Sequence, residues 1–254
     1  SVASINRAGA TALTNATSVD YTVTFNESVM QVDASDFTLS TTGTAGGTIS
    51  AVTGTGSTYT VTVSGLSGDG TLRLDLKNTG TGIVNGGSQA ITGGFTNGQT
   101  YTLDTTAPTL SISTVATDDA INDAEDESSV TVSGTSSGAD GQTVTVNVGG
   151  TSKTATIAAG GAWSVTLTSA EVKALAQGNV SITADVNDAA GNAATQTTKT
   201  VMYDKTAPTA PSAPDMTAAT DTGSSSTDNN TSNATPSFTG TAEANSTVTL
   251  YDTD

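Results

Sequence analysis

The chain has 254 residues, of which 12% are charged, about half the share found in an ordinary soluble domain. Its 24 acidic and 7 basic residues give a net charge of −17, so a nucleic-acid partner, which needs clustered Lys and Arg, is not expected. Cysteine and histidine are absent, which excludes disulfides, zinc sites of the usual ligand types, thiol nucleophiles and Ser-His-Asp triads.

The first hundred residues alternate apolar and polar side chains over several short runs. The alternating apolar residues are Val19, Tyr21, Val23 and Phe25, then Tyr59, Val61 and Val63, then Leu72, Leu74 and Leu76. A period of two is typical of a β-strand with one face on a core and one face in water. The segment Ser67-Gly68-Asp69-Gly70 separates two of these runs, and its Gly and Asp residues favour a tight hairpin turn.

The second hundred residues continue the same pattern. The apolar residues that alternate are Val130 and Val132, then Val144, Val146 and Val148, then Trp163, Val165 and Leu167, then Val180, Ile182, Ala184 and Val186. One helix is predicted, where Thr168 and Glu171 form a capping box and Gly178 gives a stop signal. About two helical turns fit between them, so we interpret this helix as a connector in an all-β fold.

A five-residue motif occurs twice, one hundred positions apart. We call Asp104–Pro108 the first linker motif and Asp204–Pro208 the second. A hundred residues is the usual size of a small β-sandwich, so the sequence predicts sandwiches joined end to end. The predicted domains are 1–104, 105–204 and 205–254. We expect the last to be the N-terminal half of a third sandwich, because Thr247–Leu250 repeats the strand pattern of Thr143–Val146.

Further motifs accompany the linker motifs, namely Gly161-Ala162-Trp163-Ser164-Val165, Asp188-Ala189-Ala190-Gly191-Asn192 and Thr239–Val248. With them, the chain resembles the immunoglobulin-like repeats of giant, type I-secreted bacterial surface adhesins. Residues 1–104 resemble a sister subtype through Thr24–Val29. The resemblance implies immunoglobulin-like β-sandwiches, a secreted or cell-surface location, neighbouring repeats as partners, and Ca²⁺ at or near the domain junctions. It also implies that distal domains bind a surface glycan or protein.

Acidic residues concentrate in the predicted loops, most densely over 118–127. Clustered carboxylates repel one another, and Ca²⁺ relieves this by accepting about six to eight carboxylate, amide and backbone oxygens. The candidate Ca²⁺ ligands are Asp104, Asp118, Asp119, Asn122, Glu125, Asn187, Asp188, Asn192, Asp204, Asp221 and Asp228. The alternative is that these are solvated acidic loops without ions.

Sandwich topology predicts which candidates meet. The first loop of a sandwich lies at the end far from its start, and its last turn returns to the start. We therefore expect Asp104 to approach Asn187, Asp188 and Asn192. We also expect a second group at the junction that follows, in which Asp204 lies on the same side as Asp118, Asp119, Asn122 and Glu125.

We interpret the chain as a structural extender segment of an adhesin that serves in biofilm formation or surface attachment, stiffened by Ca²⁺, and not as an enzyme. No stretch approaches the roughly 18 apolar residues of a membrane span, so membrane insertion is not expected. Trp163, the single Trp, alternates with Val165 and Leu167, which favours core packing over stacking on a sugar. The alternatives left open are a glycan- or protein-binding adhesive module, an accessory sandwich of a secreted hydrolase, and a filament subunit that exchanges strands.

Overall fold

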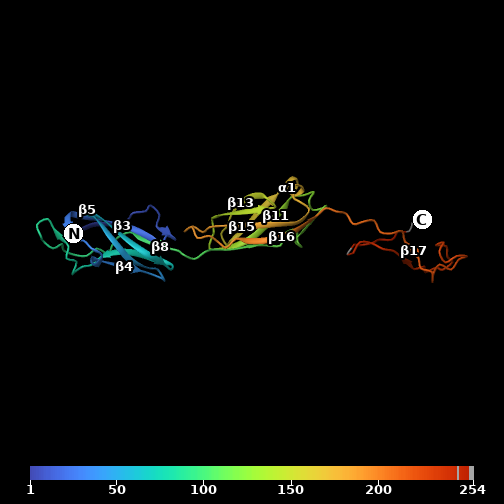
Figure 1. Cartoon of the computed structure of the whole chain (residues 1–254), viewed down its shortest axis with the longest axis horizontal. Helices are drawn as coiled ribbons and strands as arrows, with labels where there is room; N and C mark the ends of the chain where they lie inside the picture. Colours follow the sequence, from blue (N-terminus) through green and yellow to red (C-terminus); the bar gives the residue numbers. More distant parts are fainter. Residues whose placement is uncertain (245, 252–254) are drawn as a thin grey trace. The chain divides into compact units, whose positions relative to one another are not determined.

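The computed structural model describes residues 1–244 and 246–251, and the secondary structure of this part is almost entirely β (Figure 1). Its buried apolar residues form two separate clusters. One draws on residues between Ile5 and Leu103, and the other on residues between Val115 and Tyr203. Asp104 lies between the two clusters in the sequence. The predicted all-β fold is confirmed.

Two sheets enclose the first cluster. The first of these sheets has the order β1-β3-β5, with β7 also on β3, and the other has the order β2-β8-β6-β4. The strands of the first sheet are β1 (Val2–Arg7), β3 (Ser18–Met30), β5 (Gly46–Ser67) and β7 (Val84–Asn85). The strands of the other sheet are β2 (Leu13–Thr14), β8 (Thr100–Leu103), β6 (Gly70–Leu76) and β4 (Phe37–Thr41), which follows the short 3₁₀ helix η1 (Ala34–Asp36).

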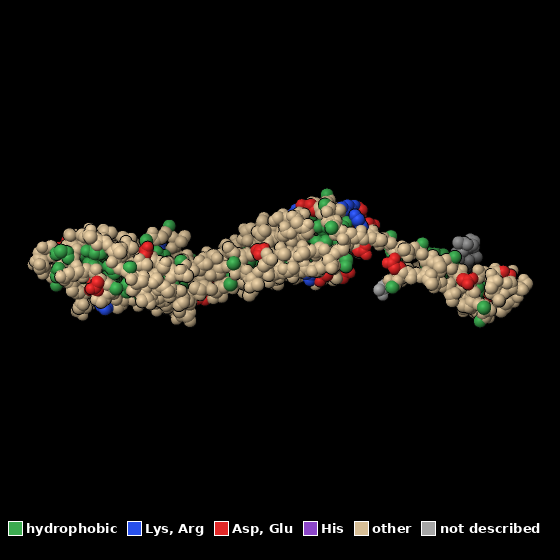
Figure 2. All heavy atoms as spheres, viewed as in Figure 1, with side chains coloured by type: hydrophobic (Ala, Val, Ile, Leu, Met, Phe, Trp, Pro, Cys, Tyr) green, Lys and Arg blue, Asp and Glu red, His purple; other side chains and the backbone are tan. Residues whose placement is uncertain are grey.

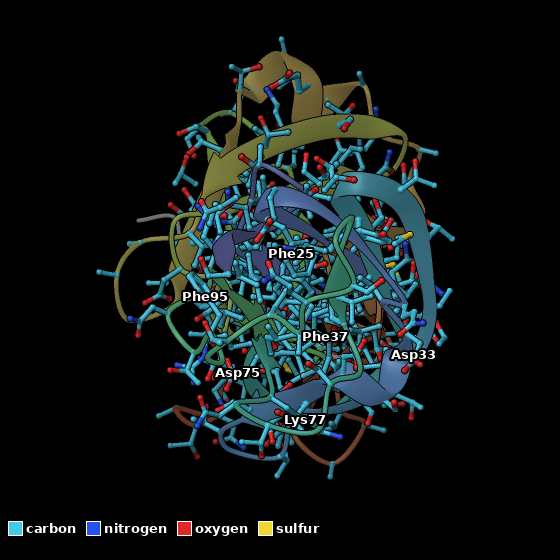
Figure 3. All side chains as sticks on the ribbon, turned by 90° about the vertical axis from the view of Figure 1, so that its left-hand side faces the viewer. Phe25, Asp33, Phe37, Asp75, Lys77 and Phe95 are labelled. Atoms are coloured by element: carbon cyan, nitrogen blue, oxygen red, sulfur yellow. The ribbon has the colours of Figure 1, made fainter. Side chains whose placement is uncertain are left out.

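The alternating residues of these strands fill the space between the sheets. Tyr21, Val23, Val61 and Leu72 are fully buried. The Tyr21 hydroxyl donates a 2.6 Å hydrogen bond to the carbonyl of Leu72, so the one polar atom of this buried side chain is satisfied. Figure 3 looks onto this end of the chain, with Phe25 and the other core side chains toward the middle.

The second cluster also lies between two sheets. One has the order β14-β11-β9 and the other β10-β16-β15-β12-β13. The strands of the smaller sheet are β9 (Thr109–Ile112), β11 (Val130–Ser137) and β14 (Ala162–Leu167). The strands of the larger sheet are β10 (Ala120–Asn122), β12 (Thr143–Val148), β13 (Thr151–Thr156), β15 (Gly178–Asp185) and β16 (Thr197–Asp204).

Trp163 packs in this second core, as predicted, and is only 4% exposed. Its ring lies directly over Gly134 of the neighbouring strand β11. A Cβ on Gly134 would lie 2.4 Å from the Trp163 ring and 1.9 Å from the carbonyl oxygen of Ser111, so only glycine fits here.

The predicted connector helix is present but shorter than expected. α1 (Ser169–Lys173) begins at the capping box, in which Thr168 Oγ1 accepts from Glu171 N–H and the Glu171 carboxylate accepts from Thr168 N–H. After Lys173 the chain tightens, and Leu175 N–H bonds to the carbonyl of Val172 three residues back. This i→i+3 bond ends the α-helix before a second full turn.

The contacts divide the chain into two compact units, Ser1–Tyr203 and Asp204–Asp254. The second unit contains a short antiparallel pair, β17 (Asp215–Met216) with β18 (Phe238–Thr239). The strand expected over 247–250 is not formed, which corrects that prediction. Val248 and Leu250 are 57% and 60% exposed there, and an alternating pattern yields a strand only where a neighbouring strand completes its hydrogen bonds.

Across 1–244 and 246–251, no helix is long and apolar enough to cross a membrane.

Candidate functional site: the linker motifs and the acidic loops

The turn between β15 and β16 is organised around Asp188, which is 7% exposed. Asp188 Oδ1 accepts hydrogen bonds from the backbone N–H groups of Ala190, Gly191 and Asn192 at 2.9, 2.7 and 2.8 Å. Asp188 Oδ2 accepts a fourth, from Asn192 Nδ2 at 2.8 Å. Burial raises the pKa of Asp188, but these hydrogen bonds outweigh it and hold the pKa below its ordinary value. The carboxylate therefore stays ionised.

The same turn contacts the first linker motif. Asn192 Nδ2 also donates to the carbonyl oxygen of Asp104 at 2.8 Å, and Asn192 Oδ1 accepts from Asn15 Nδ2 at 3.2 Å. The Asp104 carboxylate accepts from Thr106 N–H at 3.1 Å, while Asn187 forms a backbone bridge with Ala193. The structure thus brings Asp104 and Asn192 into contact.

Sequence reasoning missed Asp69 as a contact of the first linker motif. Asp69 lies in the turn between β5 and β6, where Gly68 and Gly70 had indicated only a hairpin. Its carboxylate accepts from Thr105 N–H at 2.6 Å, from Thr105 Oγ1 at 3.1 Å and from Thr106 Oγ1 at 2.5 Å. The hydrogen bonds from the Thr106 side chain and the Thr105 backbone lower the pKa of Asp69. No local pattern could reveal a partner that lies 36 residues away in the sequence.

In the acidic loop 118–127, Asp119 forms an ion pair. Its Oδ2 lies 2.8 Å from Lys199 Nζ, and its Oδ1 accepts from Val115 N–H at 2.8 Å. Lys199 lowers the pKa of this carboxyl group. The Asp119 carbonyl accepts from Met202 N–H at 2.9 Å. Asp119 thus ties the loop to β16, and both of its carboxylate oxygens already have donors.

The other candidates of this loop form local turns. Asp118 Oδ1 accepts from Ala120 N–H at 3.0 Å. Asn122 Oδ1 accepts from Glu125 N–H at 3.1 Å, and Glu125 Oε2 accepts from Asn122 N–H at 3.1 Å. β10, which includes Asn122, is the sheet neighbour of β16, which ends at Asp204. The Asp204 carboxylate accepts from Thr206 N–H at 2.9 Å.

Asp126, a second residue that sequence reasoning missed, is the most buried carboxylate of this loop at 2% exposed. Its Oδ2 accepts from the Tyr203 hydroxyl at 2.6 Å, and its carbonyl accepts from Ser169 Oγ at 2.6 Å. Its Oδ1 lies 3.8 Å from Lys173 Nζ. The hydrogen bond to Asp126 raises the pKa of Tyr203 to about 12. Asp126 therefore joins the loop to α1 and to the end of β16. Figure 2 shows acidic and basic side chains gathered around α1.

The loop 217–231 in the second unit holds Asp221, which is 3% exposed. Its Oδ2 accepts from Asn229 N–H at 3.2 Å, whereas its Oδ1 has no hydrogen-bond partner among the described residues. Asp228 lies on the same loop and accepts from Asn230 N–H at 3.2 Å. A Cβ on Gly223 would lie 2.4 Å from the Asn230 carbonyl oxygen and 3.8 Å from Asp228 Oδ1, so the backbone at Gly223 approaches residues 228–230 closely.

A buried carboxylate oxygen without a partner is costly unless a cation or water satisfies it. Within the described residues, no three acidic side chains converge as they would in a metal site built from carboxylates alone. A cation at Asp221 would therefore need amide, hydroxyl, carbonyl or water oxygens in addition, which Ca²⁺ accepts.

Comparison with known proteins gives the following matches. A family model described as "Bacterial Ig-like domain" matches residues 207–254. A bacterial immunoglobulin-like domain from the M. primoryensis ice-binding adhesin is 34% identical, with 40% of this chain and 99% of that chain covered, at a TM-score of 0.32. A comparison with curated proteins found no match.

Two longer structures are also similar. A Ca²⁺-stabilised adhesin with which an Antarctic bacterium binds ice is 24% identical, with 84% and 51% of the two chains covered and a TM-score of 0.46. A tetra-tandem repeat from the extending region of a large adhesion protein is 22% identical, with 85% and 51% covered and a TM-score of 0.36. This chain spans about half the length of each.

All three TM-scores are below 0.5, so the family assignment depends on sequence. It is carried by the 34% identity across nearly the whole of the M. primoryensis domain and by the family model over 207–254. These matches confirm the predicted resemblance to immunoglobulin-like adhesin repeats. The chain belongs to the bacterial immunoglobulin-like domains.

Proposed function

We propose that this chain is a structural extender segment of a secreted bacterial surface adhesin. In this proposal, sandwiches 1–104 and 105–204 and the first part of a third, 205–254, project a distal binding domain from the cell. The two separate apolar clusters on either side of Asp104 support the proposal, because each encloses its own core and needs no partner to bury it. The relatives described as adhesin segments, one from an extending region, support it as well.

The proposed role is mechanical rather than catalytic. A chain of sandwiches resists extension because each module must unfold as a unit before it lengthens. Trp163, the residue best suited to stack on a sugar, is buried in the second core.

We further propose that Ca²⁺ binds in the loop 217–231, with Asp221 and Asp228 among its ligands. The observation that carries this proposal is the buried Asp221 Oδ1, which has no hydrogen-bond partner among the described residues. When bound, the ion would supply the positive charge that this oxygen lacks. The description of one relative as Ca²⁺-stabilised adds support. The candidates Asp118, Asp119, Asn122, Glu125 and Asp204 stay a prediction.

Calorimetric titration of the full chain with Ca²⁺ tests the metal site. We expect Asp221→Asn to weaken binding by about tenfold or more, because the substitution removes a charged ligand. The matched control is Asp215→Asn, which removes the same charge at an exposed position on β17. Equal binding by the wild-type chain and both variants would contradict the site.

The extender role has its own test. A glycan array and a pull-down from host-cell extracts, both with the full chain, should find no specific ligand, because the proposal assigns ligand binding to a distal domain. Saturable binding of a defined glycan would instead favour the adhesive-module alternative.

A further inference from the structure

We infer that the first linker motif is held in place by protein hydrogen bonds and needs no cation. The first-linker network consists of Asp188, Asn192 and Asn15 around Asp104, together with Asp69 around Thr105 and Thr106. It is the alternative to the predicted Ca²⁺ site at Asp104, Asn187, Asp188 and Asn192. The inference does not depend on the proposed Ca²⁺ site at Asp221.

The Asp188 carboxylate is already surrounded by donors. Three backbone N–H groups converge on Oδ1, which has two lone pairs, and the Asn192 amide bonds to Oδ2, all at 2.7 to 2.9 Å. The hydrogens of these donors carry partial positive charge and point at the oxygens, so they supply the compensation that a cation would otherwise give. A cation could reach Oδ1 only if the turn between β15 and β16 opened.

Asn192 connects this turn to the linker. Its amide nitrogen has two hydrogens, and these reach Asp188 Oδ2 and the Asp104 carbonyl, each at 2.8 Å. The amide oxygen accepts from Asn15. The Asn192 side chain therefore bonds at once to its own turn, to the linker and to a residue that precedes β3.

Gly191 allows Asn15 to approach. The φ angle of Gly191 is +99°, a conformation that favours glycine, and a Cβ at this position would lie 3.4 Å from Asn15 Nδ2. A side chain at position 191 would thus be strained by the backbone, and its Cβ would lie in van der Waals contact with Asn15.

Asp69 fixes the next part of the linker. Three hydrogen bonds from Thr105 and Thr106 converge on its carboxylate, and they include both threonine hydroxyls. The linker is consequently bonded to Asn192 at Asp104 and to Asp69 at Thr105 and Thr106. Since every partner is a protein group, chelators should leave this arrangement intact.

The test measures whether the distance between the two cores stays defined without metal. The chain lacks cysteine, so the double variant Thr58→Cys/Thr145→Cys places spin labels only on the exposed faces of β5 and β12. Double electron–electron resonance then gives a distance distribution in excess Ca²⁺ and in EDTA. We expect the two distributions to coincide, and a distribution that broadens in EDTA would overturn the inference.

Variants then test the network itself. In the labelled background, Asn192→Ala, Asn15→Ala and Asp69→Ala should each broaden the distribution, in Ca²⁺ and in EDTA alike. The matched controls are Asn6→Ala and Asp20→Ala, exposed polar residues of the first sandwich outside the network, which should leave it unchanged. Asn15→Ala and Asp69→Ala do not alter the Asp188 turn, so they remain informative if Asn192→Ala fails to fold.

If Asn15→Ala and Asp69→Ala both retain the wild-type distribution, the network does not hold the linker and the inference is wrong. Both labels lie outside the loop 217–231. Loss of the proposed Ca²⁺ site there would therefore leave this distribution unchanged, and the two proposals fail separately.

Discussion

The two linker motifs share a sequence and a local turn, but their surroundings differ. Asp104 accepts from Thr106 N–H and Asp204 accepts from Thr206 N–H, at 3.1 and 2.9 Å. At the first motif, Thr105 bonds to Asp69, whereas the second motif has Lys205 in the position of Thr105. The motif thus fixes only the turn at its aspartate. Residues far away in the sequence decide what holds the linker beyond that turn.

The largest expected effect tests the turn beside the first linker motif. Asp188→Ala removes the acceptor for three backbone N–H groups in a nearly buried position, so we expect it to lower the free energy of unfolding by about 3 kcal/mol. Urea denaturation followed by circular dichroism measures this. The control is Asp185→Ala, an exposed residue three positions earlier, and an equal loss in both variants would contradict the assigned role.

The next effect tests the attachment of β16 just before the second linker motif. Tyr203→Phe deletes the hydroxyl that donates to the buried Asp126 carboxylate, and we expect a loss of about 2 kcal/mol because a charged acceptor loses its donor. The same deletion in Tyr251→Phe, where the ring is 80% exposed, should change little. Urea denaturation of both variants compares them, and similar losses would show that the Asp126 contact contributes nothing special.

Removal of Ca²⁺ should affect the two units differently. If the dissociation constant is about 0.1 mM, about 1 mM Ca²⁺ stabilises the folded form of the Asp221 loop by roughly 1.4 kcal/mol. Hydrogen exchange with mass spectrometry should therefore show faster exchange over 217–231 in EDTA, and no change around 188–192. Faster exchange at 188–192 as well would mean that the first linker motif also depends on metal.

Acid should loosen the first-linker network from within. The pKa values of Asp188 and Asp69 are below their ordinary value of 3.8 in the folded chain, so their ionised forms favour the folded state. The stabilisation that the ionised carboxylates give the folded state is complete above the unfolded-state pKa of 3.8. It is lost as the pH falls through their lower pKa values in the folded state. The spin-label distance distribution should stay narrow down to pH 3.8 and broaden below it. Broadening at a clearly higher pH would contradict this.

The smallest expected effect comes from the variant that exchanges the one residue that differs between the two linker motifs. Thr105→Lys removes a hydroxyl donor to Asp69 but supplies an ammonium group near it, so the expected loss is only about 0.5 kcal/mol at this exposed site. The dependence of the urea midpoint on salt concentration distinguishes an ion pair from a hydroxyl contact, because salt screens the ion pair and not the hydroxyl contact. Urea midpoints for Thr105→Lys that are independent of salt would argue against the substitute ion pair.

Local patterns predicted the strands and the core well. Val144, Val146 and Val148 alternate and are all buried, because the direction of a strand side chain follows from its position alone. The capping box at Thr168 and Glu171 was equally readable, since its partners are three residues apart. The predicted strand over 247–250 failed because a strand also requires a neighbour.

The candidate site was only partly predictable, and for the same physical reason. Composition located the acidic loops, but it could not show that Asp119 pairs with Lys199 or that Asp126 meets Tyr203, since these partners lie about eighty residues apart in the sequence. Asp69 carried only a turn signal, and neither Asp69 nor Asn15 carried a local signal for contact with the linker. Asp221 was predicted as one acidic residue among several, and among the candidates it is distinguished by its buried Oδ1 without a hydrogen-bond partner in the described part of the chain.

The position of Trp163 over Gly134 has a practical consequence. Because the sequence contains no other tryptophan, indole fluorescence excited at the red edge of absorption comes from one place in one core. The wavelength of its emission will therefore follow the melting of 105–204 by itself, while backbone ellipticity follows all the sheets together. Any gap between those two melting curves measures directly how independently neighbouring sandwiches unfold.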